Sequence, residues 1–322
     1  MLTRPLGPGA PRVSAIGFGG MPLSIQGRPS EAESISVIHC ALDAGVTLID
    51  TADIYCLQNS EIGHNERLIA KALRSWSGSR DGIVVATKGG LTRPEGPAGA
   101  LGRAGRPEQL RAACERSLRA LQVECIDLYQ LHAPDPRVPF ADSVGALAEL
   151  RRAGKVRWVG LSNVDVAEIQ AAQAILPIVT VQNQFSPAVR WPLTQGVLAY
   201  CAHAGIGLLA YSPVGGRRYK AMLAADRLLG RISRRHGVSP QVVALAWLLA
   251  QGPGVIPIPG ARTEAHVLDS ISAVGLTLDA REIVDIDAGT FPVPSISGAV
   301  RSILSHVPGL RAAYRWVRGH LG

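Results

Sequence analysis

Eight short runs of apolar, largely β-branched residues recur along the whole chain, and each is followed by a longer segment of helical periodicity. Short apolar runs of this kind predict buried strands, and their alternation with helices is typical of a parallel α/β sheet. Eight such units predict a (β/α)8 TIM barrel, with the strands inside and the helices around them. The predicted strands span residues 16–19, 46–50, 83–87, 126–131, 156–161, 180–183, 207–211 and 255–258.

Signals for helix ends support this alternation. Ser30 and Glu33 have the spacing of a capping box before an apolar stripe, and Gly45 stands where that helix can end. Pro107 stands at the expected first position of another helix, where proline is favoured. We therefore expect one helix to begin just after Ser30 and another to begin at Pro107.

The 322 residues contain no linker rich in glycine, serine or proline that would separate two domains, so we expect one domain over residues 1–322. Two short stretches flank a turn at residues 7–11, which predicts a β-hairpin over residues 1–15 that caps the barrel. Residues 93–106 are rich in glycine and proline and lie between a strand and its helix, so we expect a long βα loop there.

The net charge is +8, and much of the excess lies near the end of the chain. No acidic residue follows Asp287, while four arginines do: Arg301, Arg311, Arg315 and Arg318. The apolar spacing predicts a basic amphipathic helical extension over residues 291–322. We expect it to pack on the barrel, with contact to an anionic membrane surface as the less favoured alternative. Because no nucleic-acid-binding motif accompanies the charge, we expect no nucleic-acid partner.

The composition excludes several classes of protein. With 47% hydrophobic and 18% charged residues, the chain is not expected to be disordered. Its longest apolar run, residues 242–250, is far shorter than the roughly 20 residues of a membrane span. Residues 1–11 lack the charged start and apolar run of a signal peptide, which predicts a cytoplasmic protein. The five cysteines show no paired spacing, so we expect reduced thiols and no metal site.

Polar residues follow the predicted strands at the end where barrel enzymes hold their catalytic groups. Each residue alone has an ordinary structural explanation, such as a helix cap or a solvated lysine. Several strands that each end in such a group indicate chemistry instead. The candidates are Asp50, Tyr55, Lys88, His132, Ser162, Asn163, Gln182, Tyr211 and Ser212.

Four of these candidates suit acid catalysis on a carbonyl group. A tyrosine hydroxyl has an ordinary pKa of about 10, so it is a weak acid at neutral pH. An ammonium held by a carboxylate favours tyrosinate, so we expect Lys88 and Asp50 to bring the pKa of Tyr55 nearer the working range. A neutral His132 can donate a second hydrogen bond to the same carbonyl oxygen.

Several strings in the chain resemble motifs of the aldo-keto reductase superfamily, and they occur in family order from about residue 2 to residue 287. The resemblance implies a barrel that reduces carbonyl groups with a nicotinamide cofactor. The strings are LIDTADIY (48–55), GHNE (63–66), VATK (85–88), IDLYQLH (126–132), GLSN (160–163), VQNQ (181–184), AYSP (210–213) and IPIPG (256–260).

The resemblance assigns roles to individual residues. It implies a catalytic tetrad in which Tyr55 is the general acid, and a set that holds the cofactor from the nicotinamide to the pyrophosphate. His132 favours carbonyl reduction, because relatives that reduce carbon–carbon double bonds carry glutamate there. The tetrad is Asp50, Tyr55, Lys88 and His132; Ser162, Asn163 and Gln182 hold the carboxamide, Tyr211 stacks on the ring, Gly20 and Met21 lie near the ribose, and Ser212, Val214 and Gly216 approach the pyrophosphate.

At the adenosine end, Arg262 follows Gly260 at a position where many relatives place a basic residue. A guanidinium can donate two parallel hydrogen bonds to a 2′-phosphate, so we expect NADPH (NADP+) rather than NADH. The chain departs from the family at two positions. His266 occupies a position that is often arginine in relatives, and Ser270 occupies one that is often the asparagine that contacts adenine. Asp269 keeps the acidic residue before it.

The substrate pocket is the least readable part of the site. Family position implies six lining residues: Met21, Tyr55, His132, Phe185, Trp191 and Tyr219. Their apolar and aromatic character predicts a moderately hydrophobic small-molecule carbonyl substrate rather than a highly charged one. Trp191 and Tyr219 have the alternative role of bracing the barrel.

The sequence thus predicts an NADPH-dependent oxidoreductase that reduces an aldehyde or ketone to an alcohol, with Tyr55 as general acid. Two alternatives stay open. One is a cofactor-sensing regulatory or binding subunit with the same fold and little turnover. The other is the reverse reaction, oxidation of an alcohol or sugar with NADP+, because microscopic reversibility gives the same residues both directions.

Overall fold

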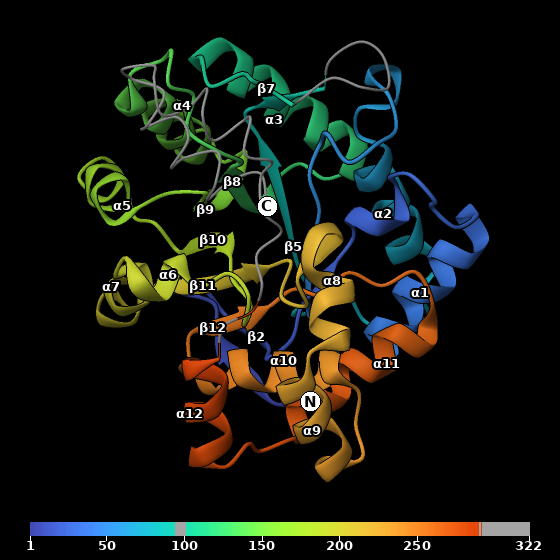
Figure 1. Cartoon of the computed structure of the whole chain (residues 1–322). Helices are drawn as coiled ribbons and strands as arrows, with labels where there is room; N and C mark the ends of the chain where they lie inside the picture. The colour runs from blue at the N-terminus through green and yellow to red at the C-terminus, as the bar shows by residue number, and fades with distance from the viewer. Residues whose placement is uncertain (94–100, 290, 292–322) are drawn as a thin grey trace, which may run out of the picture.

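A computed structural model describes residues 1–93, 101–289 and 291 of the chain. Its centre is an eight-stranded parallel sheet, whose neighbouring strands follow chain order, with helices around it (Figure 1). Each strand begins within two residues of a predicted one. The strands are β3 (Phe18–Gly19), β4 (Leu48–Asp50), β5 (Val84–Gly89), β8 (Ile126–Leu131), β9 (Val156–Ser162), β10 (Thr180–Gln184), β11 (Gly207–Tyr211) and β12 (Val255–Pro257).

The sheet closes on itself between its first and last strands. Gly19 and Gly260 form a parallel bridge, and the Gly19 N–H donates to the Pro259 carbonyl at 3.0 Å. The Gly17 N–H donates to the Pro257 carbonyl at 2.9 Å. This closure removes the sheet edges and confirms the predicted (β/α)8 barrel.

Helices cover the outside of the barrel (Figure 1). Ser30 and Glu33 form the predicted capping box, and Pro107 is the predicted first residue of its helix. Within the described residues the helices are α1 (Glu31–Asp43), α2 (His64–Ser75), α3 (Pro107–Leu121), α4 (Phe140–Arg152), α5 (Val166–Gln173), α6 (Trp191–Thr194), α7 (Val197–Ala204), α8 (Gly216–Ala225), α9 (Arg227–His236), α10 (Pro240–Ala250), α11 (Glu264–Ser272) and α12 (Ala280–Ala288).

A β-hairpin closes the N-terminal end of the barrel, as predicted. Its strands are β1 (Thr3–Pro5) and β2 (Arg12–Ser14). Leu6, which directly follows β1, and Val13, on β2, are fully buried. The Leu6 carbonyl oxygen lies so close to the start of β11 that a Cβ on Gly207 would be 2.1 Å from it. Glycine is therefore required at residue 207 for the cap to seat.

Inside the barrel, side chains two residues apart on one strand occupy successive layers. Along β4, Leu48 is followed two residues later by Asp50. Along β5, Val84, Ala86 and Lys88 follow one another at the same spacing. Leu48, Val84 and Ala86 belong to an apolar cluster that includes Leu6 and Val13 of the hairpin. The interior is thus apolar near the N-terminal ends of the strands and polar near their C-terminal ends.

One predicted segment differs from its expectation, and another lies outside the described residues. The predicted βα loop at residues 93–106 begins within a small antiparallel hairpin, β6 (Leu91–Thr92) and β7 (Gly102–Arg103). The predicted basic extension lies outside the described residues, apart from Phe291. Among the helices of the described part, none is long and apolar enough to cross a membrane.

Candidate active site

A buried lysine joins three groups at the C-terminal end of the barrel. Lys88 is fully buried, and its Nζ donates to Asp50 Oδ2 at 2.6 Å, to the Thr51 carbonyl at 2.8 Å and to the Tyr55 hydroxyl at 3.3 Å. Strands β4 and β5 pair in parallel with Asp50 opposite Ala86, which brings these side chains together. Three of the four predicted catalytic residues therefore form one connected set.

Asp50 is held from two further sides. Gln182 on β10 donates from Nε2 to Asp50 Oδ1 at 2.7 Å, and the Gly20 N–H donates to the Asp50 backbone carbonyl at 2.8 Å. Asn65 on α2 in turn donates to the Gly20 carbonyl at 2.8 Å. The carboxylate has a partner at each oxygen, which offsets the cost of burying its charge.

His132 lies edge-on to Tyr55, with ring centroids 5.9 Å apart and planes at 81°. Its backbone is fixed by two hydrogen bonds, from its own N–H to the Gly89 carbonyl at 2.8 Å and from Asn163 Nδ2 to its carbonyl at 2.9 Å. Burial, with the positive charges of Lys88 and Arg103, holds the pKa of His132 well below its ordinary value. The imidazole is therefore neutral at physiological pH, as the sequence analysis expected.

The pKa of Tyr55 differs from the expectation. Burial raises this pKa well above its ordinary value, and the negative charges of Asp50 and Asp53 raise it further. Burial also lowers the pKa of Lys88, with Asp50 acting in the opposite direction. Desolvation of the hydroxyl thus outweighs the attraction of the ammonium, and Tyr55 is firmly protonated in the free protein.

Three residues beside the tetrad carry a second hydrogen-bond chain. The Tyr211 hydroxyl donates to Asn163 Oδ1 at 2.8 Å, and Asn163 Nδ2 contacts the Ser162 hydroxyl at 3.1 Å. Asn163 and Ser212 have left-handed backbone conformations, with φ of 59° and 50°. Such conformations are uncommon outside glycine and gather at functional sites, here at the ends of β9 and β11.

The loop after β11 makes a tight turn into α8. Gly216 has φ of 56°, and a Cβ there would lie 2.6 Å from the Ser212 hydroxyl. The turn, which includes Val214, therefore leads directly into the N-terminus of α8, where backbone N–H groups favour anions. The predicted residues of this loop lie together at one corner of the C-terminal face.

The residues predicted for the adenosine end lie on and before α11. The Arg262 guanidinium is exposed and donates from Nε to the Pro22 carbonyl at 3.2 Å and from Nη2 to the Gln26 carbonyl at 2.6 Å. His266 is exposed one turn further along the chain. Asp269 accepts a hydrogen bond from the Ser239 hydroxyl at 2.8 Å. Ser270, next to Asp269, is partly exposed.

Three of the predicted substrate residues are buried or partly buried against neighbouring side chains. Phe185 is fully buried and lies edge-on to Trp247 in the core, with ring centroids 5.4 Å apart, and its contact with substrate stays a prediction. Trp191 packs against the same core, which favours its bracing role. Tyr219 is 5% exposed on α8 and packs against Gly215, which also favours bracing. Met21, at 40% exposure, is open at the surface.

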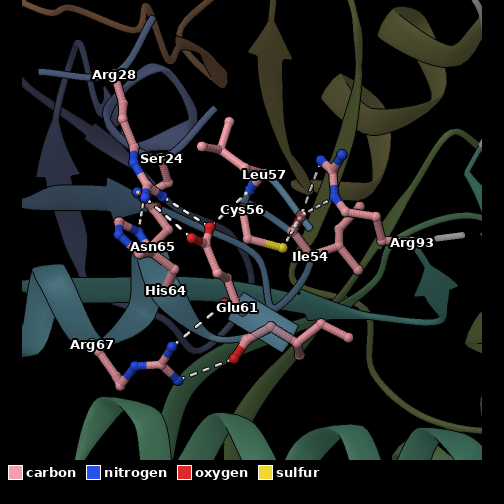
Figure 2. Close-up of polar contacts among 11 residues, drawn as sticks. Ser24, Arg28, Ile54, Cys56, Leu57, Glu61, His64, Asn65, Arg67 and Arg93 are labelled. Carbon is pink, nitrogen blue, oxygen red and sulfur yellow. Dashed lines mark hydrogen bonds and ion pairs between the residues drawn. The ribbon is translucent and has the colours of Figure 1, made fainter. Parts of the chain in front are cut away.

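Sequence reasoning missed a group of polar contacts around the loop that carries Tyr55 (Figure 2). Arg28 and Glu61 form a two-pronged ion pair at 2.9 and 3.1 Å, and they tie the loop after β3 to the loop after β4. Arg93 donates to the Ile54 carbonyl at 3.4 Å on the other side of that loop (Figure 2). The only available signal for Arg93 was its place at the start of the predicted βα loop at residues 93–106.

The model of the aldo/keto reductase family matches residues 15–289. A probable aldo-keto reductase from Glycine max is 33% identical, over 89% of this chain and 88% of that protein.

Solved structures agree. The glycerol dehydrogenase from Gluconobacter oxydans has a TM-score of 0.77 at 28% identity, over 92% of this chain and 98% of that one. An aldo-keto reductase from Klebsiella pneumoniae in complex with NADPH has a TM-score of 0.74 at 25% identity, with the same coverage of both chains. The chain therefore belongs to the aldo/keto reductase family and is an enzyme of that family.

Proposed function

We propose that the enzyme uses NADPH to reduce an aldehyde or ketone to an alcohol, with Tyr55 as general acid. The observation that carries this proposal is the fully buried Lys88, whose ammonium contacts both the Asp50 carboxylate and the Tyr55 hydroxyl. The ammonium stabilises the phenolate that Tyr55 becomes when it gives its proton to the carbonyl oxygen. Asp50 keeps Lys88 charged in spite of its burial.

Tyr55 and His132 are arranged to hold one oxygen atom between them. The neutral imidazole donates a hydrogen bond from a ring nitrogen without giving up its proton, while Tyr55 donates its hydroxyl hydrogen. His132 is 9% exposed and Tyr55 is partly buried, so their dipoles act on the developing negative charge with reduced screening by water. The firm protonation of Tyr55 in the free protein keeps the proton in place until that charge develops.

The residues next to Tyr55 suit a nicotinamide cofactor. Ser162, Asn163 and Gln182 present hydroxyl and amide groups that would hold the carboxamide, and Tyr211 would lie against the ring. The turn into α8 would hold the pyrophosphate. Bound NADPH supplies the hydride. The NADPH in the Klebsiella pneumoniae relative supports this cofactor here.

The preference for NADPH over NADH rests on Arg262. Its exposed guanidinium would bind the 2′-phosphate, with His266 beside it. We expect Arg262→Ala to raise the Kd of NADPH by about tenfold and to leave the Kd of NADH within about twofold. Protein fluorescence during titration with each cofactor measures both values. Equal weakening of the two cofactors would remove Arg262 from the phosphate site.

A panel of aldehydes and ketones tests the proposed reaction. Oxidation of NADPH, followed by the loss of its absorbance, is expected with at least one aromatic aldehyde and is expected to be slower with NADH. Tight NADPH binding without turnover over the whole panel would favour the cofactor-sensing subunit instead. Turnover only of alcohols with NADP+ would favour the reverse direction. A cytoplasmic location, tested by cell fractionation, belongs to the same proposal.

A further inference from the structure

The hydrogen bonds at Tyr55 are long. Its hydroxyl lies 3.3 Å from Lys88 Nζ, and the preceding Ile54 carbonyl accepts from Arg93 Nε and Nη2, each at 3.4 Å (Figure 2). Hydrogen bonds beyond the usual range restrain their partners weakly. The position of the Tyr55 hydroxyl therefore depends on how the connection from β4 to α2, the Tyr55 loop (residues 51–63), is held.

A buried amide fixes both ends of the Tyr55 loop to the connection from β3 to α1, the β3 loop (residues 20–30). Asn65, at the start of α2, is fully buried, and its Nδ2 donates to the Gly20 carbonyl at 2.8 Å and to the Ser24 hydroxyl at 2.7 Å. Its Oδ1 accepts from the Thr51 hydroxyl at 2.6 Å. The base of the Tyr55 loop is thus held by short hydrogen bonds.

Glu61 fixes the outer part of the Tyr55 loop to the same neighbour. Arg28 of the β3 loop donates from Nη1 to Glu61 Oε2 at 2.9 Å and from Nη2 to Oε1 at 3.1 Å (Figure 2). Oε2 also accepts at 3.1 Å from the N–H of Leu57, two residues after Tyr55. One carboxylate therefore joins the backbone just beyond Tyr55 to the β3 loop.

The Arg28–Glu61 pair has a defined geometry. Two guanidinium nitrogens contact two carboxylate oxygens, which fixes orientation as well as distance, and the side chains are 27% and 24% exposed. Hydrogen bonds from Arg28 and from the Leu57 N–H lower the pKa of Glu61. Arg111 and Glu149 on the outer helices differ, because they are exposed and both nitrogens contact one oxygen. Such an exposed pair restrains its elements little.

We propose that Arg28 and Glu61 are positioning residues for the general acid, and that their ion pair holds the Tyr55 loop with the hydroxyl in reach of the carbonyl oxygen. This inference rests on the proposed function, since it concerns the same reaction. Proton transfer needs donor and acceptor within hydrogen-bond reach, and a displacement of about 1 Å can lower a rate by about 10²-fold. The pair acts through Tyr55, so its effect on the rate depends on the Tyr55 hydroxyl.

A double-mutant cycle tests the proposal. With saturating NADPH and an aromatic aldehyde, single-turnover hydride transfer is expected to be about tenfold slower in Arg28→Met, with the Kd of NADPH within about twofold. The amplitude of the absorbance change is expected to stay full, because partial unfolding lowers the amplitude whereas a displaced Tyr55 lowers the rate. In the Tyr55→Phe background, Arg28→Met is expected to change the rate by less than about twofold, since the proton donor is already absent.

Two further variants sharpen the cycle. Arg28→Lys keeps the charge without the two-pronged geometry and is expected to restore part of the rate. Arg111→Met is the matched control and is expected to leave the rate unchanged. An unchanged rate in Arg28→Met would overturn the proposal. An equal loss in the presence and absence of the Tyr55 hydroxyl would also overturn it, since Arg28 would then act on the fold or on cofactor binding.

Backbone hydrogen exchange separates this inference from the proposed reaction. Peptides that cover residues 54–63 are expected to exchange faster in Arg28→Met than in Arg111→Met, because Glu61 then no longer joins the Tyr55 loop to the β3 loop. Faster exchange without turnover of any carbonyl compound would contradict the proposed function and leave the Arg28–Glu61 restraint on the loop standing. Equal exchange in the two variants would overturn that restraint.

Discussion

The two ends of the barrel use the same strands for opposite purposes. At the N-terminal end, Leu48 and Val84 meet Leu6 of the hairpin in a dry apolar layer. Two and four residues further along the same strands, Asp50 and Lys88 form a fully buried ion pair. These five side chains are at most 3% exposed, so the two ends differ in the free energy of burial: burial of apolar groups stabilises the fold, whereas burial of each charge must be offset by hydrogen-bond and ion-pair partners.

The difference between the two ends separates the residues that stabilise the fold from those proposed to carry out the reaction. The apolar end needs close packing and little else, as the contact between Gly207 and the Leu6 carbonyl illustrates. The polar end needs a complete set of hydrogen-bond and ion-pair partners, because a buried charge without a partner is not solvated by water. Substitutions at the two ends are therefore expected to separate loss of stability from loss of turnover.

The largest combined effect is expected at the polar end. Lys88→Met removes the cation from a buried pair and leaves Asp50 uncompensated, which is expected to destabilise the fold by about 3–5 kcal/mol. Turnover by the remaining folded protein is expected to fall about 10²- to 10⁴-fold. Urea unfolding and NADPH oxidation measure the two effects. Lys71→Met at the exposed Lys71–Glu31 pair is the control and is expected to cost less than about 1 kcal/mol.

At the apolar end the two effects are expected to separate. Leu6→Ala leaves a cavity at a fully buried position, and we expect a loss of about 2–5 kcal/mol with kcat within about twofold of the original. The control is Leu2→Ala, at a position 65% exposed, with an expected change within about 0.5 kcal/mol. If kcat fell as far with Leu6→Ala as with Lys88→Met, the claim that the apolar end contributes stability and not turnover would be contradicted.

A smaller effect is expected at the rim of the polar end. Hydrogen bonds from Arg137 and the Gly105 N–H lower the pKa of Asp135 to about 2. Because the folded pKa lies below the unfolded value, the stabilisation is present above about pH 4 and is lost as the pH falls through about 2. We expect Asp135→Asn to cost about 1–2 kcal/mol at neutral pH, since Arg137 is largely exposed. Unfolding curves of both proteins should converge in acid, and a constant difference would contradict this assignment.

The smallest effect is expected in the pH profile of turnover. Burial raises the pKa of Tyr55 and lowers that of His132. Tyr55 therefore keeps its proton as the pH rises through neutrality, and His132 stays neutral as the pH falls through its ordinary pKa. We expect kcat/KM for a neutral aldehyde to vary less than about threefold between about pH 6 and about pH 9. A bell-shaped profile centred near neutrality would show that one of these groups titrates there.

Local sequence signals predicted the barrel well. The strands at Ile126–Leu131 and Gly207–Tyr211 have the predicted bounds, because their apolar runs end sharply at polar residues or glycine. The first strand is shorter than predicted, since Gly17 bonds to Pro257 across the closure and not within a regular ladder. The pairing of β6 with β7 was not predicted, because each strand has two residues and is too short to show an alternating apolar pattern.

The residues of the candidate site were predicted more successfully than their pKa values and burial. Asp50 and Lys88 lie at the C-terminal ends of β4 and β5, Tyr55 lies in the loop after β4, and parallel pairing brings such strand ends together in any barrel. The pKa of Tyr55 depends on how completely the fold covers its hydroxyl, which no local pattern encodes. The full burial of Phe185 was not predicted for a related reason: this residue directly follows a strand end, and its position in the sequence does not reveal which side of the sheet its side chain faces.

The most direct test of the account is a single turnover of NADPH by the Tyr55→Phe variant. Phenylalanine keeps the ring against His132 and removes only the hydroxyl that contacts Lys88. With NADPH bound and an aromatic aldehyde in excess, we expect unchanged cofactor affinity and unfolding midpoint, and a hydride-transfer rate lower by about 10²- to 10⁴-fold. A rate within about threefold of the unmodified enzyme would contradict the assignment of Tyr55 as general acid and, with it, the central role of the buried ion pair.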